Sequence, residues 1–405
     1  MGRINTASGQ YGNIGGGRCN TAGQHASVSG GYFNTALNNF SFIGGGQQNC
    51  VCGGLTDSSI VGGCLNKNCQ GCSIIGGGWN NCLTGSTGFS GILSGGANCV
   101  VSGGIAFIGS GCKNFIRCAN HSAIVNGCSN TIDCGASCGL IGNGEQNSIR
   151  CCSPYSSIQN GCLNLICINQ SFGFIANGQS NCINGANGFI GNGCLNTINN
   201  EHEFVGNGVN NAMNGAFGSI INGESNSNDG NYSTIINGNY NCITSSGYFG
   251  TSSGTLTLNE RWGQRVHANH NFNGNAGNGQ HFELVAYVQV VDDTPVSMLL
   301  DGGSLPIETR DDTAISVNIK TLGTTNDFRQ ISSDVFAVFY NTGGTLTMSH
   351  CERYAHHVGS GFSPNDLEVQ ATNNCIDILV AGQANKNTRF VSYITGIEYE
   401  IPPDP

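Results

Sequence analysis

Cysteine is the residue whose number and spacing in this chain could most readily do chemistry. There are 22 cysteines among 405 residues. Twenty of them lie in the first 250 residues, at matching positions of a repeat. Matching positions of stacked strands lie about 4.8 Å apart, inside the ~4.4–6.8 Å Cα separation that a disulfide needs. The pairs that this spacing would allow to bond are Cys82 with Cys99, Cys112 with Cys128, and Cys52 with Cys69.

The same cysteines fit two other interpretations. Cysteine is a small, weakly polar residue that a ladder of stacked strands tolerates as a filler. Zinc would need two matched pairs at short spacing, and Cys69 with Cys72 has no second pair of that kind. We therefore expect no metal site, and no motif points to a cofactor.

Histidines and paired acids gather near the C-terminal end. His267, His270 and His281 are close in sequence, and acids are paired at 292–293 and 311–312. Acids in turns between strands are usually solvated, although an ion site or a carboxylate pair without fixed spacing is a further interpretation. No GxSxG or HExxH motif is present. We expect no catalytic residue and no enzymatic activity.

Ligand contact is better matched by the stretch YAHHVGSGFSPND, residues 354–366. It mixes aromatic residues, histidines and glycine between two expected strands, and exposed aromatic rings can stack on a ligand while tyrosine donates hydrogen bonds. The candidate receptor-binding residues are Tyr354, His356, His357 and Phe362. An ordinary long loop is the alternative.

A tandem repeat must position these residues. Asparagine recurs at spacings of 14 to 17 residues, at Asn5, Asn20, Asn34, Asn49, Asn66, Asn81, Asn98, Asn114, Asn130, Asn147, Asn164, Asn181, Asn196, Asn211, Asn226 and Asn241. Each has glycine three residues before it, and from Asn20 onward isoleucine or valine six residues before it. An apolar residue follows two positions later in all but two repeats, where Asn68 and Asn228 stand.

This pattern predicts a β-solenoid. Apolar residues at period two indicate short strands, and glycine supplies the positive φ of a sharp turn. Two strands and two turns make one coil, which can bury its apolar face only by stacking on its neighbours. The asparagines would then form a column of hydrogen-bonded side chains, with Asn49 to Asn196 as its central part.

The composition changes after residue 250. Residues 1–250 hold 6 basic and 7 acidic residues, which leaves 8 (14 − 6) and 17 (24 − 7) for the rest. Eight alternating segments between residues 281 and 401 predict strands, which favours a β-sandwich or jelly roll. We expect a shaft over 1–245, a linker over 246–260 and a head domain over 261–405.

Two families resemble these regions. NTASGQYGNIGGGRCNTAGQHASVSGGYFNTA (5–36) and SSIVGGCLNKNCQGCSIIGGGWNN (58–81) resemble the head repeats of trimeric autotransporter adhesins and the related repeats of bacteriophage tail fibres, although the units of this chain are longer than the usual adhesin repeat. The resemblance implies a left-handed β-roll and three packed chains.

The segments RWGQRVHANHNF, SMLLDGG and DILVAGQANKNTRFVSYITGIEYE are similar to a C-terminal domain found on phage tail fibres. The matching positions are Trp262, Gln264, Val266, His267, Phe272, Leu300, Asp301, Gly302, Gly382, Lys386, Arg389 and Phe390, the last in place of the usual Trp. This resemblance implies a trimeric distal domain and carries over no catalytic residue.

These observations favour a structural fibre protein, a tail fibre or receptor-binding spike of a virion, assembled in the host cytoplasm. Its expected partners are two further copies of itself, a fibre or baseplate protein at the N-terminal end, and a host-surface glycan or protein receptor. The formal charge of −10 argues against nucleic acid as a partner, and no apolar stretch is long enough to insert into a membrane. A bacterial surface adhesin or extracellular filament is the alternative, and a polysaccharide depolymerase spike the third interpretation.

Overall fold

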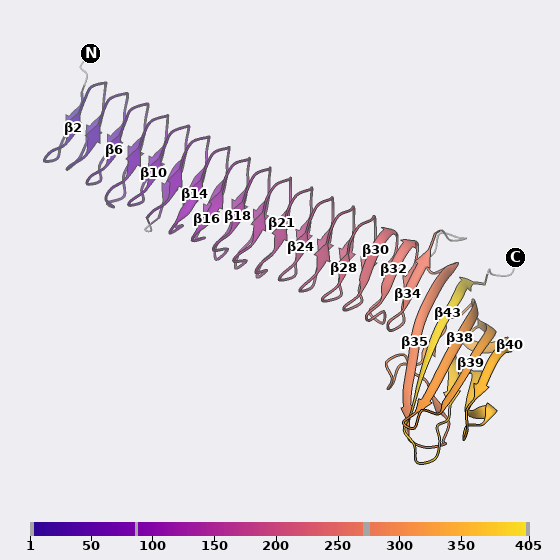
Figure 1. Cartoon of the computed structure of the whole chain (residues 1–405). Coiled ribbons are helices and arrows are strands. Elements are labelled where there is room, and N and C mark those ends of the chain that lie inside the picture. Colours follow the sequence, from indigo (N-terminus) through magenta and orange to yellow (C-terminus); the bar gives the residue numbers. More distant parts are fainter. Residues whose placement is uncertain (1–3, 86–87, 270–275, 402–405) are drawn as a thin grey trace. The chain divides into compact units, whose positions relative to one another are not determined.

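The computed structural model describes residues 4–85, 88–269 and 276–401. Apart from one turn of 3-10 helix, η1 (Pro364–Asp366), the described residues form strands, turns and bends. Two compact units, Met1–Val209 and Asn210–Pro405, each have their own packing. The predicted all-β fold with a parallel β-solenoid is confirmed (Figure 1).

Each coil of unit 1 contributes one short strand to each of two parallel sheets. The first sheet consists of β1 (Thr6–Ala7), β3 (Thr21–Ala22), β5 (Thr35–Ala36), β7 (Cys50–Val51), β9 (Lys67–Asn68), β11 (Cys82–Thr84), β13 (Cys99–Val101), β15 (Phe115–Arg117), β17 (Thr131–Ile132), β19 (Ser148–Ile149), β21 (Leu165–Ile166), β23 (Cys182–Ile183) and β25 (Thr197–Ile198). The second consists of β2 (Asn13–Ile14), β4 (Ser27–Val28), β6 (Phe42–Ile43), β8 (Ser59–Ile60), β10 (Ile74–Ile75), β12 (Gly91–Ile92), β14 (Ala106–Ile108), β16 (Ser122–Ile124), β18 (Leu140–Ile141), β20 (Ser157–Ile158), β22 (Phe174–Ile175), β24 (Phe189–Ile190) and β26 (Phe204–Val205).

The apolar residues that recur in the sequence stack directly on one another. Ile141 pairs with Ile124 on one side and Ile158 on the other, and Ile149 pairs with Ile132 and Ile166 in the facing sheet. All of these side chains are fully buried. Burying one aliphatic side chain of this size contributes about 1.5–3 kcal/mol, so stacking of coils supplies the core that a single coil lacks.

The asparagine corner, at which the recurring asparagine closes each GxxN turn, is held by side-chain bonds to the backbone. The amide nitrogen of Asn147 donates to the carbonyl oxygens of Asn143 at 3.3 Å and Gly161 at 2.9 Å. Its backbone N–H donates to Oδ1 of Asn130 at 3.0 Å, and its own Oδ1 accepts the backbone N–H of Asn164 at 3.0 Å. Each asparagine thus joins its own coil to both neighbouring coils.

Glycine three residues before the asparagine is required by close stacking as well as by conformation. Gly144 has φ +109°, a region that side chains with a Cβ avoid. A Cβ there would lie 2.0 Å from the carbonyl oxygen of Gly161 and 2.6 Å from Nδ2 of Asn147. Any other residue would push two coils apart.

The opposite corner, three residues before the buried isoleucine or valine of the second sheet, is built differently. Its residue is left-handed but is not glycine: Tyr155 has φ 58° and Phe172 has φ 59°. The backbone N–H of Phe172 donates to the carbonyl of Pro154 in the preceding coil at 3.1 Å. The two aromatic side chains are exposed and stack with their centroids 5.2 Å apart.

The interrupted position Asn68 of the apolar ladder is accommodated by hydrogen bonds. Its buried amide donates to the carbonyl oxygens of Ser59 at 3.1 Å and Ser73 at 3.2 Å, and Oδ1 accepts from the Ser73 hydroxyl at 2.8 Å. In unit 2, Asn228 makes the equivalent contacts with Ser219 and Ser233. A serine at the start of the second strand therefore accompanies each buried asparagine.

Unit 2 begins with further coils. Its strands are β27 (Ala212–Met213), β28 (Ser219–Ile220), β29 (Ser227–Asn228), β30 (Thr234–Asn239), β31 (Cys242–Ile243), β32 (Thr251–Thr255), β33 (Leu258–Asn259) and β34 (Arg265–Ala268). β32 pairs in parallel with β30, and β33 pairs with β31. The segment expected as a linker, residues 246–260, therefore contains strands that continue the pairing of the coils, while the domain boundaries stay a prediction.

The head follows in the same sheet. β34 pairs antiparallel with β35 (Gln280–Val290), and the sheet continues through β43 (Thr388–Glu400), β38 (Thr313–Thr325), β39 (Gln330–Thr342) and β40 (Thr345–Val358). A second antiparallel sheet is centred on β42 (Cys375–Val380), with β36 (Val296–Ser297) and β37 (Ile307–Glu308) on one edge and β41 (Leu367–Thr372) on the other. The short strands β34 and β37 were not predicted.

The two head sheets share one apolar core, to which Phe282, Phe339 and Phe390 contribute from the first sheet and Ile378 from the second. At its border the buried guanidinium of Arg261 contacts both carboxylate oxygens of Glu398 at 3.0 and 2.8 Å. Glu398 is buried, yet Arg261 and then Arg310 outweigh the effect of burial and lower its pKa to about 2. Within the described ranges, no helix has the length and apolar character needed to span a membrane.

Candidate functional site

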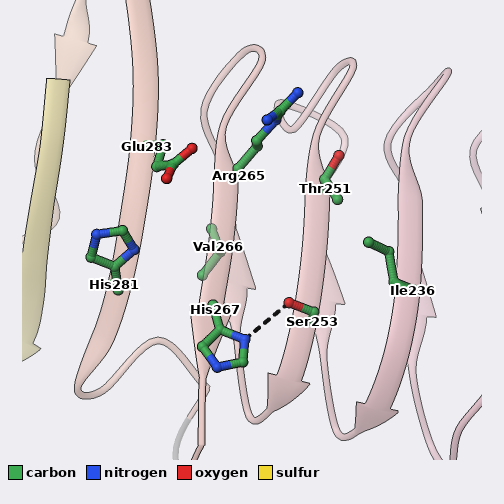
Figure 2. Close-up of a pocket in the computed structure, with 8 residues that line it drawn as sticks. All are labelled: Ile236, Thr251, Ser253, Arg265, Val266, His267, His281 and Glu283. Atoms are coloured by element: carbon green, nitrogen blue, oxygen red, sulfur yellow. Dashed lines mark hydrogen bonds between the residues drawn. The ribbon is translucent and has the colours of Figure 1, made fainter. Parts of the chain in front are cut away.

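A shallow pocket of about 380 Å³ lies on the outer face of unit 2, where the strands of the last coils meet the first long strand of the head (Figure 2). β30, β32, β34 and β35 supply its walls. It is lined by Ile236, Thr251, Ser253, Arg265, Val266, His267, His281 and Glu283.

Strand geometry brings the polar side chains of this pocket together. Along β34 exposed and buried residues alternate, so Arg265 and His267 point away from the core. In the antiparallel pair with β35, Arg265 lies opposite Glu283 and His267 lies opposite His281. Residues directly opposite each other in such a pair have Cβ atoms about 4.5–5.5 Å apart. A guanidinium, a carboxylate and two imidazoles therefore share one small area.

The imidazole of His267 is fixed by two neighbours. Its Nδ1 lies 3.0 Å from the hydroxyl of Ser253, as Figure 2 shows, and its Nε2 lies 3.0 Å from Oδ1 of Asn269. An amide oxygen accepts, so Nε2 donates to Asn269, while the serine hydroxyl can either donate to or accept from Nδ1. These two contacts hold the ring in place on the sheet.

A second hollow of about 250 Å³ continues the pocket along the same face. Arg265 and Glu283 line both hollows, and Tyr393 of β43 joins them. Burial, and next the hydrogen bond to Glu283, raise the pKa of Tyr393. The Tyr393 hydroxyl therefore stays protonated and donates to the carboxylate of Glu283.

This set of groups is suited to binding a hydroxyl-rich ligand. Arg265 can bind a carboxylate or phosphate through two parallel hydrogen bonds, while the hydroxyls and imidazoles can donate to and accept from sugar hydroxyls. Glu283 is the one carboxylate among the described lining residues, whereas glycoside hydrolysis usually uses a pair. The described residues contain no cluster of three histidine, cysteine or acidic side chains placed to hold a metal ion.

The predicted receptor-binding residues lie elsewhere. Tyr354, His356 and His357 belong to β40, which pairs with β39, so the strand continues where a loop was expected. Burial, and then Arg353, lower the pKa of His356. Phe362 is half-buried against the head core, with its ring 6.5 Å from that of Phe390. Their role in receptor binding stays a prediction.

The proposed cysteine pairs lie in adjacent coils as free thiols. The sulfur atoms of Cys52 and Cys69 are 2.7 Å apart. Two further pairs are in strand register, Cys82 with Cys99 and Cys112 with Cys128. Whether any of them oxidises stays a prediction.

The thiols differ in acidity. Burial, followed by the neighbouring Cys52, raises the pKa of Cys69 to about 12. A hydrogen bond from Cys99, helped by the charge of Lys67, lowers the pKa of Cys82 to about 7. Because the thiolate is the reactive form of cysteine, Cys82 should be far more reactive than Cys69.

The positions shared with the tail-fibre domain have structural tasks in this chain. Trp262 stacks on Tyr248 with centroids 4.8 Å apart, and Asp301 accepts the backbone N–H groups of three successive residues, the nearest at 2.8 Å. Phe272 and His270 lie outside the described residues. Arg265 and Glu283 were not singled out from the sequence; the alternation along β35 is a signal for Glu283, whereas β34 has only four residues.

Comparisons with known proteins give a structural likeness and no match in sequence. No protein-family model matches the chain, and no curated protein matches it. Among solved structures, a tailspike protein of the Acinetobacter baumannii bacteriophage Fri1, a capsular polysaccharide depolymerase, is similar over 98% of this chain and 71% of its own, at 9% identity and a TM-score of 0.24.

That finding corrects one expectation. We expected this chain not to be an enzyme, and the similar structure belongs to a protein described as a depolymerase. We therefore withdraw the expectation. A TM-score of 0.24 assigns no activity to this chain, so enzymatic activity has to be tested by experiment.

Proposed function

We propose that this chain is a structural fibre protein of a virion, a tail fibre or receptor-binding spike that attaches to a host surface. The observation that carries the proposal is the asparagine corner. In coil after coil, one buried asparagine side chain bonds the backbone of its own coil and that of the next coil, while the facing apolar ladders are fully buried. Such a core is suited to a stiff fibre, since every coil is bonded to the next through both its backbone and its side chains.

Attachment is assigned to the pocket around Arg265 and His267 in unit 2. A repeating solenoid presents similar coils along its length, whereas this pocket combines a guanidinium, two imidazoles and a carboxylate at one place. A host-surface glycan is the partner that this chemistry favours, with a protein receptor as the alternative.

Assembly into a homotrimer is part of the proposal. Beyond the pocket, the head sheet exposes large apolar side chains, among them Leu322 and Val391, which are paired on β38 and β43. Exposed apolar patches usually mark contact surfaces. Three weak sites on one fibre would gain avidity through effective concentration, with another fibre or baseplate protein holding the N-terminal end.

A binding experiment tests the proposal. The full chain is applied to an array of bacterial surface glycans, beside Arg265→Ala/His267→Ala and the control Arg389→Ala, which removes an exposed arginine of the same sheet. Loss of the charged contact should weaken binding about 10- to 100-fold, and the control should bind as the natural protein does. Equal binding by all three would contradict the assigned site.

Two further measurements separate the alternatives. Viscosity and reducing-end release are followed for each polysaccharide that binds, because a depolymerase spike would shorten it. Antibodies against the chain are then located by electron microscopy. Labelled virions support the fibre, whereas labelled bacterial surfaces or filaments support the adhesin.

A further inference from the structure

The outer face of the second sheet of unit 1, β2 to β26, is uncharged and largely apolar. Two positions per coil point outward there: the residue before the buried isoleucine or valine, and the residue after it. None of these positions from Asn13 to Gly206 holds a charged residue. Six consecutive coils each expose one large apolar side chain on this face, to between 38% and 52%: Phe42, Val61, Ile74, Leu93, Phe107 and Val125.

The large side chain changes sides from coil to coil. In three of these coils it precedes the buried isoleucine and a glycine follows; in the three between, a small residue precedes and the large one follows. The six outward pairs are Phe42/Gly44, Ser59/Val61, Ile74/Gly76, Gly91/Leu93, Phe107/Gly109 and Ala123/Val125. The face therefore has two columns in which bulky and small residues alternate.

Backbone packing explains part of this alternation. A Cβ at Gly109 would lie 2.4 Å from the carbonyl oxygen of Val125 in the next coil, so this position has room only for glycine. The ring of Phe107 then lies over that glycine, with Cε1 at 3.4 Å from the same Cβ position. Bulky side chains and glycines therefore lie next to each other on this face.

The outer face of the first sheet, β1 to β25, differs in the same coils. It carries Lys67, Arg117, Asp133 and Arg150 among its outward residues. Arg117 and Asp133 form an exposed ion pair at 2.8 Å. The charged face of the first sheet can therefore remain in contact with solvent. The charge-free face of the second sheet has no charged residue at its outward positions, and the cores of protein interfaces are likewise depleted of charged residues.

We propose that the charge-free face of unit 1 packs against the same unit of another copy of this chain, an assignment that rests on the proposed fibre. The occupant must match a pattern that repeats once per coil over at least six coils. A second copy has the same coil spacing and the same alternation of bulky and small residues. In a symmetric assembly one patch can then serve every subunit.

Matched substitutions on the two faces test the assignment. Leu93→Lys/Phe107→Lys places two charges on the charge-free face, and Leu165→Lys/Phe115→Lys places the same charges on outward positions of β21 and β15. The mass of each protein is measured by light scattering at several concentrations, with circular dichroism as a check of folding. We expect self-association at least tenfold weaker for the first variant and unchanged for the second.

A footprint of the natural protein gives a result that does not depend on folding of a variant. Carbene labelling compares Leu93 with Leu195, which are 52% and 53% exposed in the single chain. We expect strong protection of Leu93 and free labelling of Leu195. Equal labelling of the two residues in an oligomer would contradict this interface but not the proposed fibre. A monomer that binds glycans would contradict the interface but not the proposed role in attachment.

Discussion

At the asparagine corner the same residue recurs from Asn5 to Asn241. Its side chain bonds the backbone, as Asn147 does through three bonds. At the opposite corner the left-handed position holds tyrosine, histidine, phenylalanine, aspartate, cysteine or asparagine. Both corners turn the chain through φ near +60° at a non-glycine residue. Backbone bonds to the preceding coil hold both corners, as for the N–H of Gln146 on the Cys128 carbonyl and the N–H of Phe172 on the Pro154 carbonyl. The asparagine corner adds a repeated set of side-chain bonds to the backbone.

This difference explains where the repeat can vary. A corner that depends on side-chain bonds fixes its residues and its length, whereas a corner held mainly by backbone bonds accepts many residues. The coil length changes at the opposite corner: Tyr155 lies eight residues after Asn147, and Asn187 lies six after Asn181. The first corner stabilises the stack, and the second is free to carry surface chemistry.

The largest effect is expected from removing the same side chain at each corner. Asn147→Ala leaves the buried N–H of Asn164 without its acceptor and should lower the free energy of unfolding by about 2–4 kcal/mol. Asn187→Ala, at the exposed opposite corner, should cost about 1 kcal/mol because alanine tolerates the left-handed region less well. Urea denaturation of both variants measures the difference.

Hydrogen exchange provides the local control for that comparison. The amide of Asn164 should exchange much faster in Asn147→Ala and at the natural rate in Asn187→Ala. Similar losses of stability for the two variants would mean that the corners contribute equally, and would contradict the different roles assigned to them.

A buried acid at the opposite corner is expected to make stability depend on pH. Glu203 is 1% exposed, and burial, opposed by bonds from the N–H groups of Asn200 and Asn199, raises its pKa to about 7. A raised pKa in the folded state stabilises at low pH, and this contribution is lost as pH rises from the unfolded value through 7. Unfolding should therefore cost about 1–3 kcal/mol more near pH 5 than near pH 8.

Glu203→Ser, which installs the residue found at this position in coils such as that of Ser156, should remove most of this pH dependence. Glu201→Ser changes an exposed acid of the same corner and should preserve it. If stability follows the same pH curve in all three proteins, the buried carboxylate is not the cause.

A smaller loss is expected from breaking one aromatic stack. Phe172 and Tyr155 lie almost parallel, at 7°, and such pairs contribute about 0.5–1.5 kcal/mol beyond their buried area. Phe172→Ala should lower stability by about 1 kcal/mol, and Phe172→Leu by less because the apolar contact remains. Equal effects of the two variants would assign the contribution to apolar burial alone.

The thiols beside the two corners should differ in reactivity with almost no change in stability. Iodoacetamide near pH 8 should modify Cys82, whose pKa is about 7, well before Cys69, whose pKa is about 12. Peptide mapping by mass spectrometry after short reaction times measures both. Faster modification of Cys69 would contradict the assigned acidities.

The same difference between the corners determined which positions could be predicted from the sequence. The asparagine, glycine and isoleucine positions were predictable because they keep fixed distances from one another. The stacked aromatic residues of the opposite corner, such as Tyr155 and Phe172, were not predicted. They lie at a fixed distance from the following isoleucine but at a variable distance from the preceding asparagine, so an alignment on asparagine does not bring them to one position. The pocket was missed because Arg265 and Glu283 belong to different strands, and β34 is too short to show a period.

The mass of the natural protein in solution tests the central claim most directly. Light scattering on a sizing column, with and without reductant, should give three times 42.0 kDa (3 × 42.0 = 126 kDa) in both conditions, because the proposed interface is apolar and contains no disulfide. A particle of 42.0 kDa at all concentrations would contradict the assembled fibre.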